Sequence, residues 1–286
     1  MPHSSDRIIN GLSVDVEDYF QVQALASVYP RSGWDGYESR VERNTQLILD
    51  LFSEAGVKAT FFTLGWVAQR RPGLIRRIAE AGHELASHGF SHLRVDSQCP
   101  AEFREDVRKS RGILEDIAGT PVRGYRAATF SVGPRTPWAW RVLEEEGYAY
   151  SSSVYPVARD FYGMPDAPRT VYKPDGAAKL VEIPISTVRL GNRNWPCGGG
   201  GYFRLLPYGL SRAAIRRVNG EGAPAVFYIH PWELDPEQPR PAGVPLKSRF
   251  RHYTNLSKTG HRLRRLAHDF SWDRMDRAFQ IDGNLT

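Results

Sequence analysis

Cysteine and long apolar runs are both scarce in this chain of 286 residues. Its two cysteines, Cys99 and Cys197, are too few for a disulfide framework. No stretch approaches the roughly 18 apolar residues of a membrane span, and the first twenty residues lack the pattern of a signal peptide. These absences favour a protein of a reducing, cytoplasmic compartment. Any association with a membrane is then expected to depend on a partner.

The chain carries a formal net charge of +6, which raises the question of an anionic partner such as nucleic acid. Much of the basic excess lies in three short helical clusters, residues 70–77, 212–217 and 261–268. Clusters of this kind are usually solvated helix faces, and no pattern of a nucleic-acid-binding fold is present. We therefore expect no nucleic acid partner.

Apolar, β-rich segments alternate with amphipathic helical segments from end to end. The expected strands are 8–16, 58–65, 83–88, 122–127, 148–153, 179–186 and 223–230. The expected helices are 39–55, 66–81, 100–118, 134–146, 208–219 and 257–270. This order predicts an α/β protein with a parallel sheet, either open or closed into a barrel. Residues 153–202 are largely an irregular excursion in this interpretation, and 231–256 form a proline-rich tail.

Reactive side chains occur where four of these strands end. They are Asp15, His88, Arg126 and His230. In parallel α/β folds the carboxyl ends of the strands meet at one edge, where chemistry usually takes place. We therefore expect the four side chains to share one site.

His88 and His92 have a spacing that brings two imidazoles together on one helical face, where they can bind one ion. Such a pair also occurs in plain surface turns. The acidic residues at the end of the first strand, Asp15, Glu17 and Asp18, favour a metal site, because two imidazoles and one carboxylate leave positions open for a substrate. His83 lies at the other end of its strand and is interpreted as structural.

Four motifs in this order resemble those of the polysaccharide deacetylases, the group with the NodB homology domain and similar to carbohydrate esterase family 4. They are VDVED, SHGFSH, GYRAATFS and FYIHPWE, and the resemblance covers roughly residues 8–270. GGGGYFRLLPY (198–208) and FRHYTNLSKTGHRLRRL (250–266) are similar to the branch found beside exopolysaccharide gene clusters and exosortase systems.

The resemblance implies a distorted (β/α) barrel of about seven parallel strands, with one divalent metal, zinc first among the candidates. It implies a single catalytic domain over residues 1–286, with a C-terminal extension at about 231–286. By the same resemblance Asp15 is the catalytic base, Arg126 holds that carboxylate, and His230 is the general acid. His88 and His92 are the metal histidines. Glu17 is the favoured metal carboxylate, and Asp18 is its rival.

The implied reaction is removal of N-acetyl groups from N-acetylhexosamine units of a polysaccharide or oligosaccharide, in the making or modification of an exopolysaccharide. Flat aromatic rings stack on sugar faces, which makes four aromatic residues candidate substrate contacts: Trp195, Tyr202, Trp232 and Tyr155. The polymer, its linkage and the oligomeric state are left open by the sequence.

The chain departs from the family pattern at two places. Arg126 is followed by Ala127 and Ala128 where many relatives have Arg-x-Pro, and Ser151 stands where aspartate is common. The second departure leaves the partner of His230 in doubt. Two other functions therefore stay open: an allantoinase-like hydrolase of a small cyclic amide, and a carbohydrate-binding protein whose catalytic site has decayed.

Overall fold

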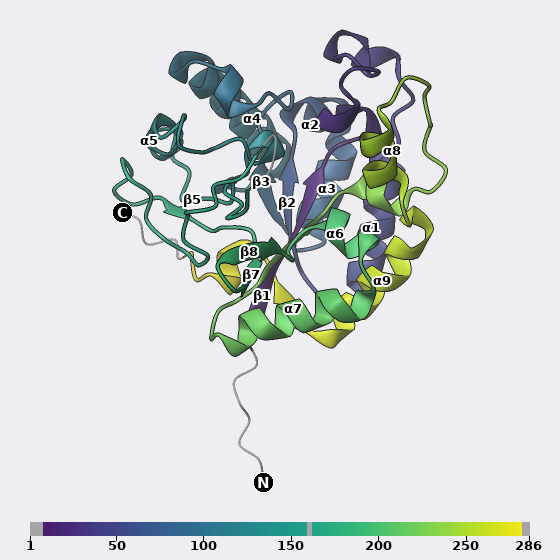
Figure 1. The fold of residues 1–286 in the computed structure, drawn as a ribbon. Helices are drawn as coiled ribbons and strands as arrows, with labels where there is room; N and C mark the ends of the chain where they lie inside the picture. Colours follow the sequence, from purple (N-terminus) through teal and green to yellow (C-terminus); the bar gives the residue numbers. More distant parts are fainter. Residues whose placement is uncertain (1–7, 159–161, 282–286) are drawn as a thin grey trace.

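A parallel β-sheet with helices around it forms the centre of the protein (Figure 1). The computed structural model describes residues 8–158 and 162–281. In the described part, eight strands belong to this sheet. They are β1 (Ile9–Val16), β2 (Thr60–Thr63), β3 (Glu84–Ser87), β4 (Gly124–Tyr125), β5 (Tyr150–Ser151), β6 (Val181–Glu182), β9 (Val226–Ile229) and β10 (Ser271–Asp273).

Strand β1 is the middle of the sheet. It pairs with β2 on one side and with both β9 and β10 on the other, and every pair in the sheet is parallel. The remaining order runs β2, β3, β4, β5, β6, so that the sheet curls toward a barrel. The predicted distorted (β/α) barrel is confirmed, with β10 as one short strand more than expected.

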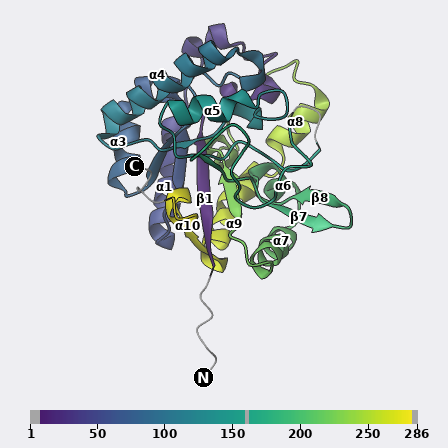
Figure 2. The ribbon, with the colours of Figure 1, turned by 90° about the vertical axis from the view of Figure 1, so that its left-hand side faces the viewer.

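Helices cover the outside of the curled sheet, as Figure 2 shows from a second direction. Their bounds are α1 (Val41–Ala55), α2 (Gly65–Arg70), α3 (Pro72–Glu80), α4 (Pro100–Ala118), α5 (Trp138–Glu145), α6 (Gly200–Leu205), α7 (Tyr208–Gly220), α8 (Leu246–Tyr253), α9 (Leu256–Asp269) and α10 (Met275–Ala278). The central strands are buried on both faces, which is why they appear as continuous apolar runs in the sequence.

The single helix expected over 66–81 is wrong, because the structure has two helices, α2 and α3, in this range. Arg71 between them adopts φ −131° and ψ 55°, outside the helical region. The next residue, Pro72, disfavours helical backbone in the residue before it and lacks the N–H that would continue α2. It is instead the first residue of α3, where no N–H is needed.

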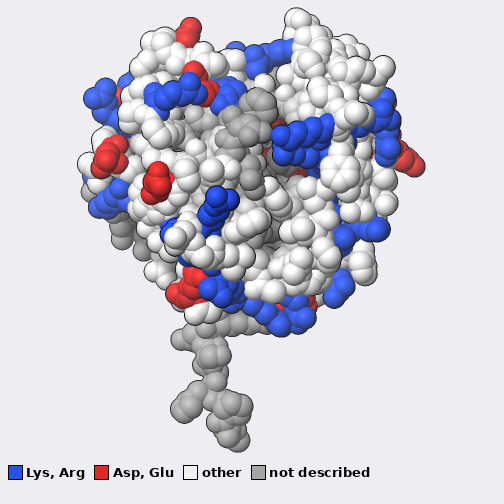
Figure 3. Space-filling view, viewed as in Figure 1, with Lys and Arg blue, Asp and Glu red and all other residues white. Residues whose placement is uncertain are grey.

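The segments expected to be irregular contain regular structure. Residues 153–202 include the antiparallel hairpin of β7 (Thr187–Leu190) and β8 (Arg193–Pro196) and the start of α6. The proline-rich tail 231–256 includes a 3-10 turn, Pro231–Leu234, and the whole of α8. In the described ranges 8–158 and 162–281, no helix has the length and apolarity needed to cross a bilayer. Lys and Arg side chains form several separate groups on the face shown in Figure 3.

Candidate active site

The four side chains predicted at strand ends do meet at one edge of the sheet. Asp15 is the second-last residue of β1, His88 directly follows β3, Arg126 directly follows β4, and His230 directly follows β9. Strands β1, β3 and β4 each pair with a strand on both sides, and β9 pairs with β1 and, at Tyr228, with Gly199 through an isolated bridge. Asp15, His88 and His230 line one pocket of about 180 Å³.

Glu17, His88 and His92 form a candidate metal centre beside Asp15. One ligand atom from each of the three lies within 4.8 Å of the others, and all three side chains are buried. His92 Nε2 is 3.0 Å from Glu17 Oε2, yet this oxygen accepts no hydrogen bond from the described residues. A buried carboxylate oxygen without a donor is costly, and a shared cation would satisfy it. The residues present therefore fit a divalent metal.

The two histidines lie in the loop after β3 rather than on a helical face, so the predicted geometry of the H-x-x-x-H spacing is wrong. Left-handed backbone at Gly89 (φ 75°) and His92 (φ 54°) turns the loop so that both rings face the pocket. A β-carbon at Gly89 would also lie 2.8 Å from a carboxylate oxygen of Asp106. The glycine between the histidines is therefore required by this turn.

The protonation of the three residues suits a cation. Burial lowers the pKa of His88, and burial together with His88 lowers that of His92 well below its ordinary value. Neutral imidazoles are the form that binds metal. His88 Nδ1 is also 2.8 Å from the carbonyl oxygen of Arg126, and a bond of that kind fixes ring orientation. Burial raises the pKa of Glu17 to about 7, although the charge of His230 and the hydrogen bond from Trp232 oppose that rise. A cation beside Glu17 would favour its ionised form further.

Asp18, the rival metal carboxylate, has a different role in the structure. Its carboxylate accepts hydrogen bonds from the backbone N–H groups of Tyr19, Arg40 and Val41, at 2.8 to 3.1 Å. It thereby caps a short 3-10 turn and the start of α1. The chain turns between the two acids, so that Glu17 faces the pocket and Asp18 faces the helix.

Asp15 and Arg126 form a buried ion pair next to the candidate metal centre. Arg126 Nη1 is 2.6 Å from Asp15 Oδ1, and the side chain of Arg126 is 0% exposed. The guanidinium also donates to the hydroxyl of Ser13 and to the hydroxyl and carbonyl oxygens of Ser152. A buried arginine held by this many acceptors supplies a fixed positive charge to Asp15.

His230 faces both carboxylates of the pocket through one ring nitrogen. Its Nε2 is 3.2 Å from Glu17 Oε1 and 4.0 Å from Asp15 Oδ2. On its other side Nδ1 is 2.8 Å from Glu233 Oε1. Burial lowers the pKa of His230, but the charges of Glu17 and Glu233 more than offset burial and raise it to about 9.

Glu233 is a site residue that the sequence reasoning missed. Arg204, from α6, approaches Glu233 Oε2 to 2.6 Å. Burial raises the pKa of Glu233, but Arg204 and His230 outweigh burial and lower it to about 2. Glu233 lies three residues after His230 in the motif FYIHPWE, so its position in the sequence was the available signal. Ser151, the position where the family pattern suggested a partner for His230, instead donates its hydroxyl to Ser153.

Of the four aromatic residues predicted to contact substrate, Trp232 lines the pocket. The other three, although within the described ranges, do not line it: Tyr155 is buried in the core beside Phe130 and Tyr162, Trp195 is exposed on the hairpin, and Tyr202 belongs to α6. The aromatic residues that line the pocket and were missed are Phe130, Tyr162 and Tyr228. Of these, Phe130 and Tyr228 lie within the quoted motifs, which was the available signal.

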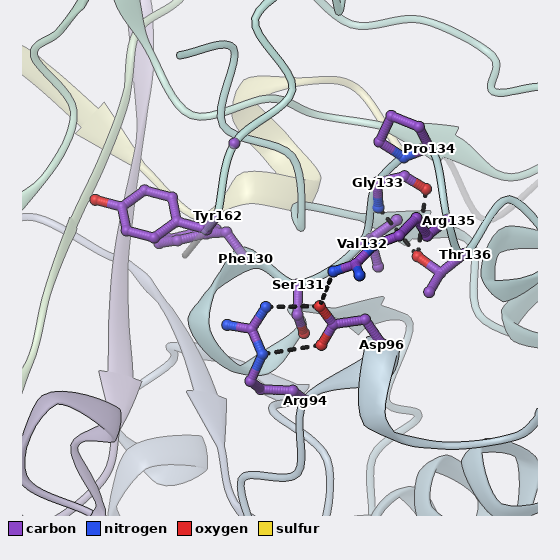
Figure 4. Close-up of a pocket in the computed structure, with 11 residues that line it drawn as sticks. Arg94, Asp96, Phe130, Ser131, Val132, Gly133, Pro134, Arg135, Thr136 and Tyr162 are labelled. Carbon is purple, nitrogen blue, oxygen red and sulfur yellow. Dashed lines mark hydrogen bonds and ion pairs between the residues drawn. The ribbon is translucent and has the colours of Figure 1, made fainter. Parts of the chain in front are cut away.

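A second cavity of about 210 Å³ adjoins the first, and Phe130 and Tyr162 line both (Figure 4). Its far wall carries Asp96, which Arg94 binds through two hydrogen bonds and Arg135 through one. The side chain of Arg135 is 84% exposed, so most of its donors are open to solvent. The two cavities thus share an aromatic wall, with the candidate metal centre on one side of it and Asp96 with its two arginines on the other.

Two family models match the chain in sequence. The model described as "Polysaccharide deacetylase" matches residues 34–151, and the model "Domain of unknown function (DUF3473)" matches residues 152–280. The candidate site combines both regions with the strand before them, because Arg126 lies in the first, His230 in the second, and Asp15 precedes both.

Curated relatives match the chain over short lengths. The peptidoglycan-N-acetylglucosamine deacetylase of Bacillus cereus is 39% identical over 75 residues, 26% of this chain and 27% of the relative. The chitooligosaccharide deacetylase of Bradyrhizobium sp. is 31% identical over 113 residues, 32% of this chain and 51% of the relative. The chain thus spans between about a quarter and a half of these relatives.

Solved structures share the fold over nearly the whole chain. A Mycobacterium smegmatis protein assigned to the polysaccharide deacetylases has a TM-score of 0.59 at 19% identity, covering 95% of this chain and 90% of that one. The allantoinase PuuE has a TM-score of 0.60 at 17% identity, covering 97% and 91%. These identities show the fold alone. The sequence matches, by contrast, show that the chain contains a polysaccharide deacetylase domain, which the family model places at residues 34–151.

Proposed function

We propose that this protein is a metal-dependent hydrolase that removes N-acetyl groups from N-acetylhexosamine units of a polysaccharide. One observation carries the proposal: Glu17, His88 and His92 converge beside a buried carboxylate, Asp15, and a histidine, His230. This set of groups suits hydrolysis of an amide, which needs an activated water, a base and an acid for the leaving amine. The intact set argues against a decayed binding protein.

A bound divalent cation would polarise the acetyl carbonyl and make water a stronger acid. Asp15 would accept the proton of the attacking water, and Arg126 would hold its carboxylate in place through Oδ1. His230 would donate a proton from Nε2 to the sugar nitrogen as the C–N bond breaks, giving acetate and a free amine. Trp232, stacked on His230 at 5.0 Å between ring centroids, would limit movement of that ring.

The adjoining cavity supports a polymer rather than a small cyclic amide as substrate. A small amide would fill the 180 Å³ pocket alone, whereas a glycan could extend past Phe130 and Tyr162 into the second cavity. The named activities of the curated relatives, which act on peptidoglycan or chitooligosaccharides, agree with a saccharide substrate. An exopolysaccharide as the particular polymer rests on the resemblance of residues 198–208 and 250–266 and on the DUF3473 match.

We also propose that the described residues act as one catalytic unit. The strand β1 pairs with β2 from the first matched region and with β9 and β10 from the second. The general acid His230 lies in the second region and the metal histidines in the first. Neither region alone would contain the complete set of reacting groups.

The test is acetate release from N-acetylglucosamine oligomers by the full chain loaded with zinc. We expect acetate and free amine in equal amounts, loss of activity after chelation, recovery with added zinc, and loss in His88→Ala. Exposed His261→Ala on α9 is the matched control and should behave as the wild type. Acetate release that survives both chelation and His88→Ala would refute the proposed metal site.

A further inference from the structure

We propose that Glu233 and Arg204 are positioning residues that hold His230 for proton donation. Both lie in the region matched only as a domain of unknown function, residues 152–280. The inference deepens the proposed function and rests on it. By this inference, residues 152–280 supply both the general acid, His230, and the two side chains that orient it, Glu233 and Arg204.

The contact between Glu233 and His230 fixes which nitrogen faces the pocket. Glu233 Oε1 is 2.8 Å from Nδ1 of the ring and 3.1 Å from the backbone nitrogen of His230, from which it accepts a second bond. Nε2 is thereby directed at Glu17 and Asp15, on the side where a substrate would lie. A carboxylate on one nitrogen of an imidazole sets the orientation with which the other nitrogen transfers protons.

Arg204 fixes the carboxylate in turn. Its Nε is 2.6 Å from Glu233 Oε2, while Nη1 donates to the carbonyl oxygens of His252 and Thr254 and Nη2 to that of Arg251. The guanidinium is therefore bound on both sides, to Glu233 and to the end of α8. Both side chains are almost fully buried, at 2% and 1% exposure, so that solvent neither screens nor loosens the pair.

A second layer of stacked rings holds the same histidine. Trp232 stacks on His230 on one face, and His252 of α8 stacks on Trp232 with 4.2 Å between ring centroids. His252 Nε2 is 2.7 Å from the amide oxygen of Gln238. Glu233 therefore sets which way the imidazole of His230 points, and the stacked ring of Trp232 sets the plane in which that imidazole lies.

The glycine run 198–201 allows α6 to bring Arg204 to this place. A β-carbon at Gly200, the first residue of α6, would overlap with the carboxylate group of Glu233. A β-carbon at its neighbour Gly201 would meet no atom within 4 Å. The backbone of α6 is therefore packed directly against Glu233, and only Gly200 of these two is required for the contact.

This difference between adjacent glycines provides the first test. Gly200→Ala should displace the Glu233 carboxylate without changing any charge. We expect kcat on N-acetylglucosamine oligomers to fall about 10- to 100-fold, the usual effect of losing an orienting partner, with KM and bound zinc within twofold of the wild type. Gly201→Ala should retain wild-type kcat. Equal kcat in Gly200→Ala and the wild type would overturn the proposal.

The second test removes the charge. Glu233→Gln should lower kcat by a similar factor at unchanged KM and zinc content, and Glu233→Asp should recover part of the loss. The matched control is Asp235→Asn, because Asp235 is also a buried carboxylate paired with arginines, Arg40 and Arg43, two residues further along. A purely structural ion pair predicts that Glu233→Gln and Asp235→Asn both lower the melting temperature and leave kcat unchanged; that result would also overturn the proposal.

The outcomes separate this inference from the proposed function. A zinc-loaded wild type that releases no acetate contradicts the proposed function itself. An active wild type whose Gly200→Ala and Glu233→Gln variants keep full kcat contradicts only the positioning role. Gly200→Ala preserves every charge of the buried pair, so it decides the question if Glu233→Gln fails to fold.

Discussion

Adjacent acidic residues, Glu17 and Asp18, acquire different roles because the chain turns between them. The sequence resemblance favoured Glu17 as the metal carboxylate and left Asp18 as its rival, since the two residues directly follow β1. The choice depends on which carboxylate finds backbone donors. Asp18 finds three of them, from Tyr19, Arg40 and Val41, whereas Oε2 of Glu17 finds none in the described part of the chain.

Asp18→Ala and Glu17→Gln should therefore have opposite consequences. Asp18→Ala should lower the free energy of unfolding by about 1 to 3 kcal/mol, because it leaves buried N–H groups and the start of α1 uncapped, and it should retain zinc. Glu17→Gln should fold and bind zinc at least about 10-fold more weakly. Denaturant unfolding and zinc titration measure the two effects. Loss of zinc from a folded Asp18→Ala variant would reverse the assignment.

His83, interpreted as structural from the sequence, predicts a pH dependence of stability. Its Nδ1 accepts the backbone N–H of Ala59, and burial, followed by the charges of Lys58 and Arg274, lowers its pKa to about 4. The unfolded chain binds a proton near the ordinary value of about 6.5. Between these values the unfolded state holds more protons, so stability is present above pH 6.5 and is lost as the pH falls toward 4.

A His83→Gln variant should show a smaller loss of stability between pH 7 and pH 5 than the wild type. The midpoints of denaturant unfolding at the two pH values give the comparison, on protein without metal. His268→Gln, an exposed position at the end of α9, is the control. An unchanged pH dependence in His83→Gln would show that folding does not lower the pKa of His83.

At the scale of elements, the alternation of strands and helices could be predicted because strands buried on both faces are continuous apolar runs. Because the carboxyl ends of parallel strands meet at one edge of the sheet, the sequence also predicted that Asp15, His88, Arg126 and His230 lie together. Short strands could not be predicted, because they contain too few residues to show a hydrophobic pattern. Strand β10 has three residues, and the hairpin β7–β8 carries exposed side chains that hide its alternation.

The loop between β3 and α4 shows what spacing alone misses. His88 and His92 converge through left-handed backbone, which a count of four residues does not reveal. Gly89→Ala should therefore lower zinc affinity by roughly 10-fold or more, since alanine resists φ 75° and its β-carbon would press on Asp106.

Gly112→Ala is the control for that change, because a β-carbon there meets no atom within 4 Å and α4 is helical throughout. It should stabilise the protein by up to about 1 kcal/mol and leave zinc binding unchanged. Zinc titration of both variants is the measurement. Wild-type zinc affinity in Gly89→Ala would show that the loop can bring the two histidines together with a different backbone conformation.

At the scale of the molecule, the two adjoining cavities predict that activity depends on substrate length. Arg135→Ala removes donors at the rim of the second cavity and should raise KM for an N-acetylglucosamine tetramer about fivefold, as loss of one hydrogen bond of roughly 1 kcal/mol would. It should leave KM for a single N-acetylglucosamine unchanged. Arg141→Ala on α5, also exposed, is the control. An equal change of KM for the tetramer and for single N-acetylglucosamine would show that the glycan does not extend into the second cavity.

The way the two matched regions share one site could be predicted only in part. The motifs fixed the order of Asp15, His88, Arg126 and His230, but the partner of His230 depends on a 3-10 turn and on α6 packing from the side. Contacts of this kind join residues 29 positions apart, as Arg204 and Glu233 are. Neither the hydrophobic periodicity of the sequence nor the spacing of its motifs predicts such contacts.

The most direct test of the central claim is an anomalous diffraction map, recorded above and below the zinc edge, of crystals of the full chain grown with zinc. We expect one peak within about 2.0–2.2 Å of one oxygen of Glu17 and one nitrogen each of His88 and His92, with Asp15 beside it and Asp18 still bound to the start of α1. A map without a peak at this place, or a peak bound by Asp18, would contradict it.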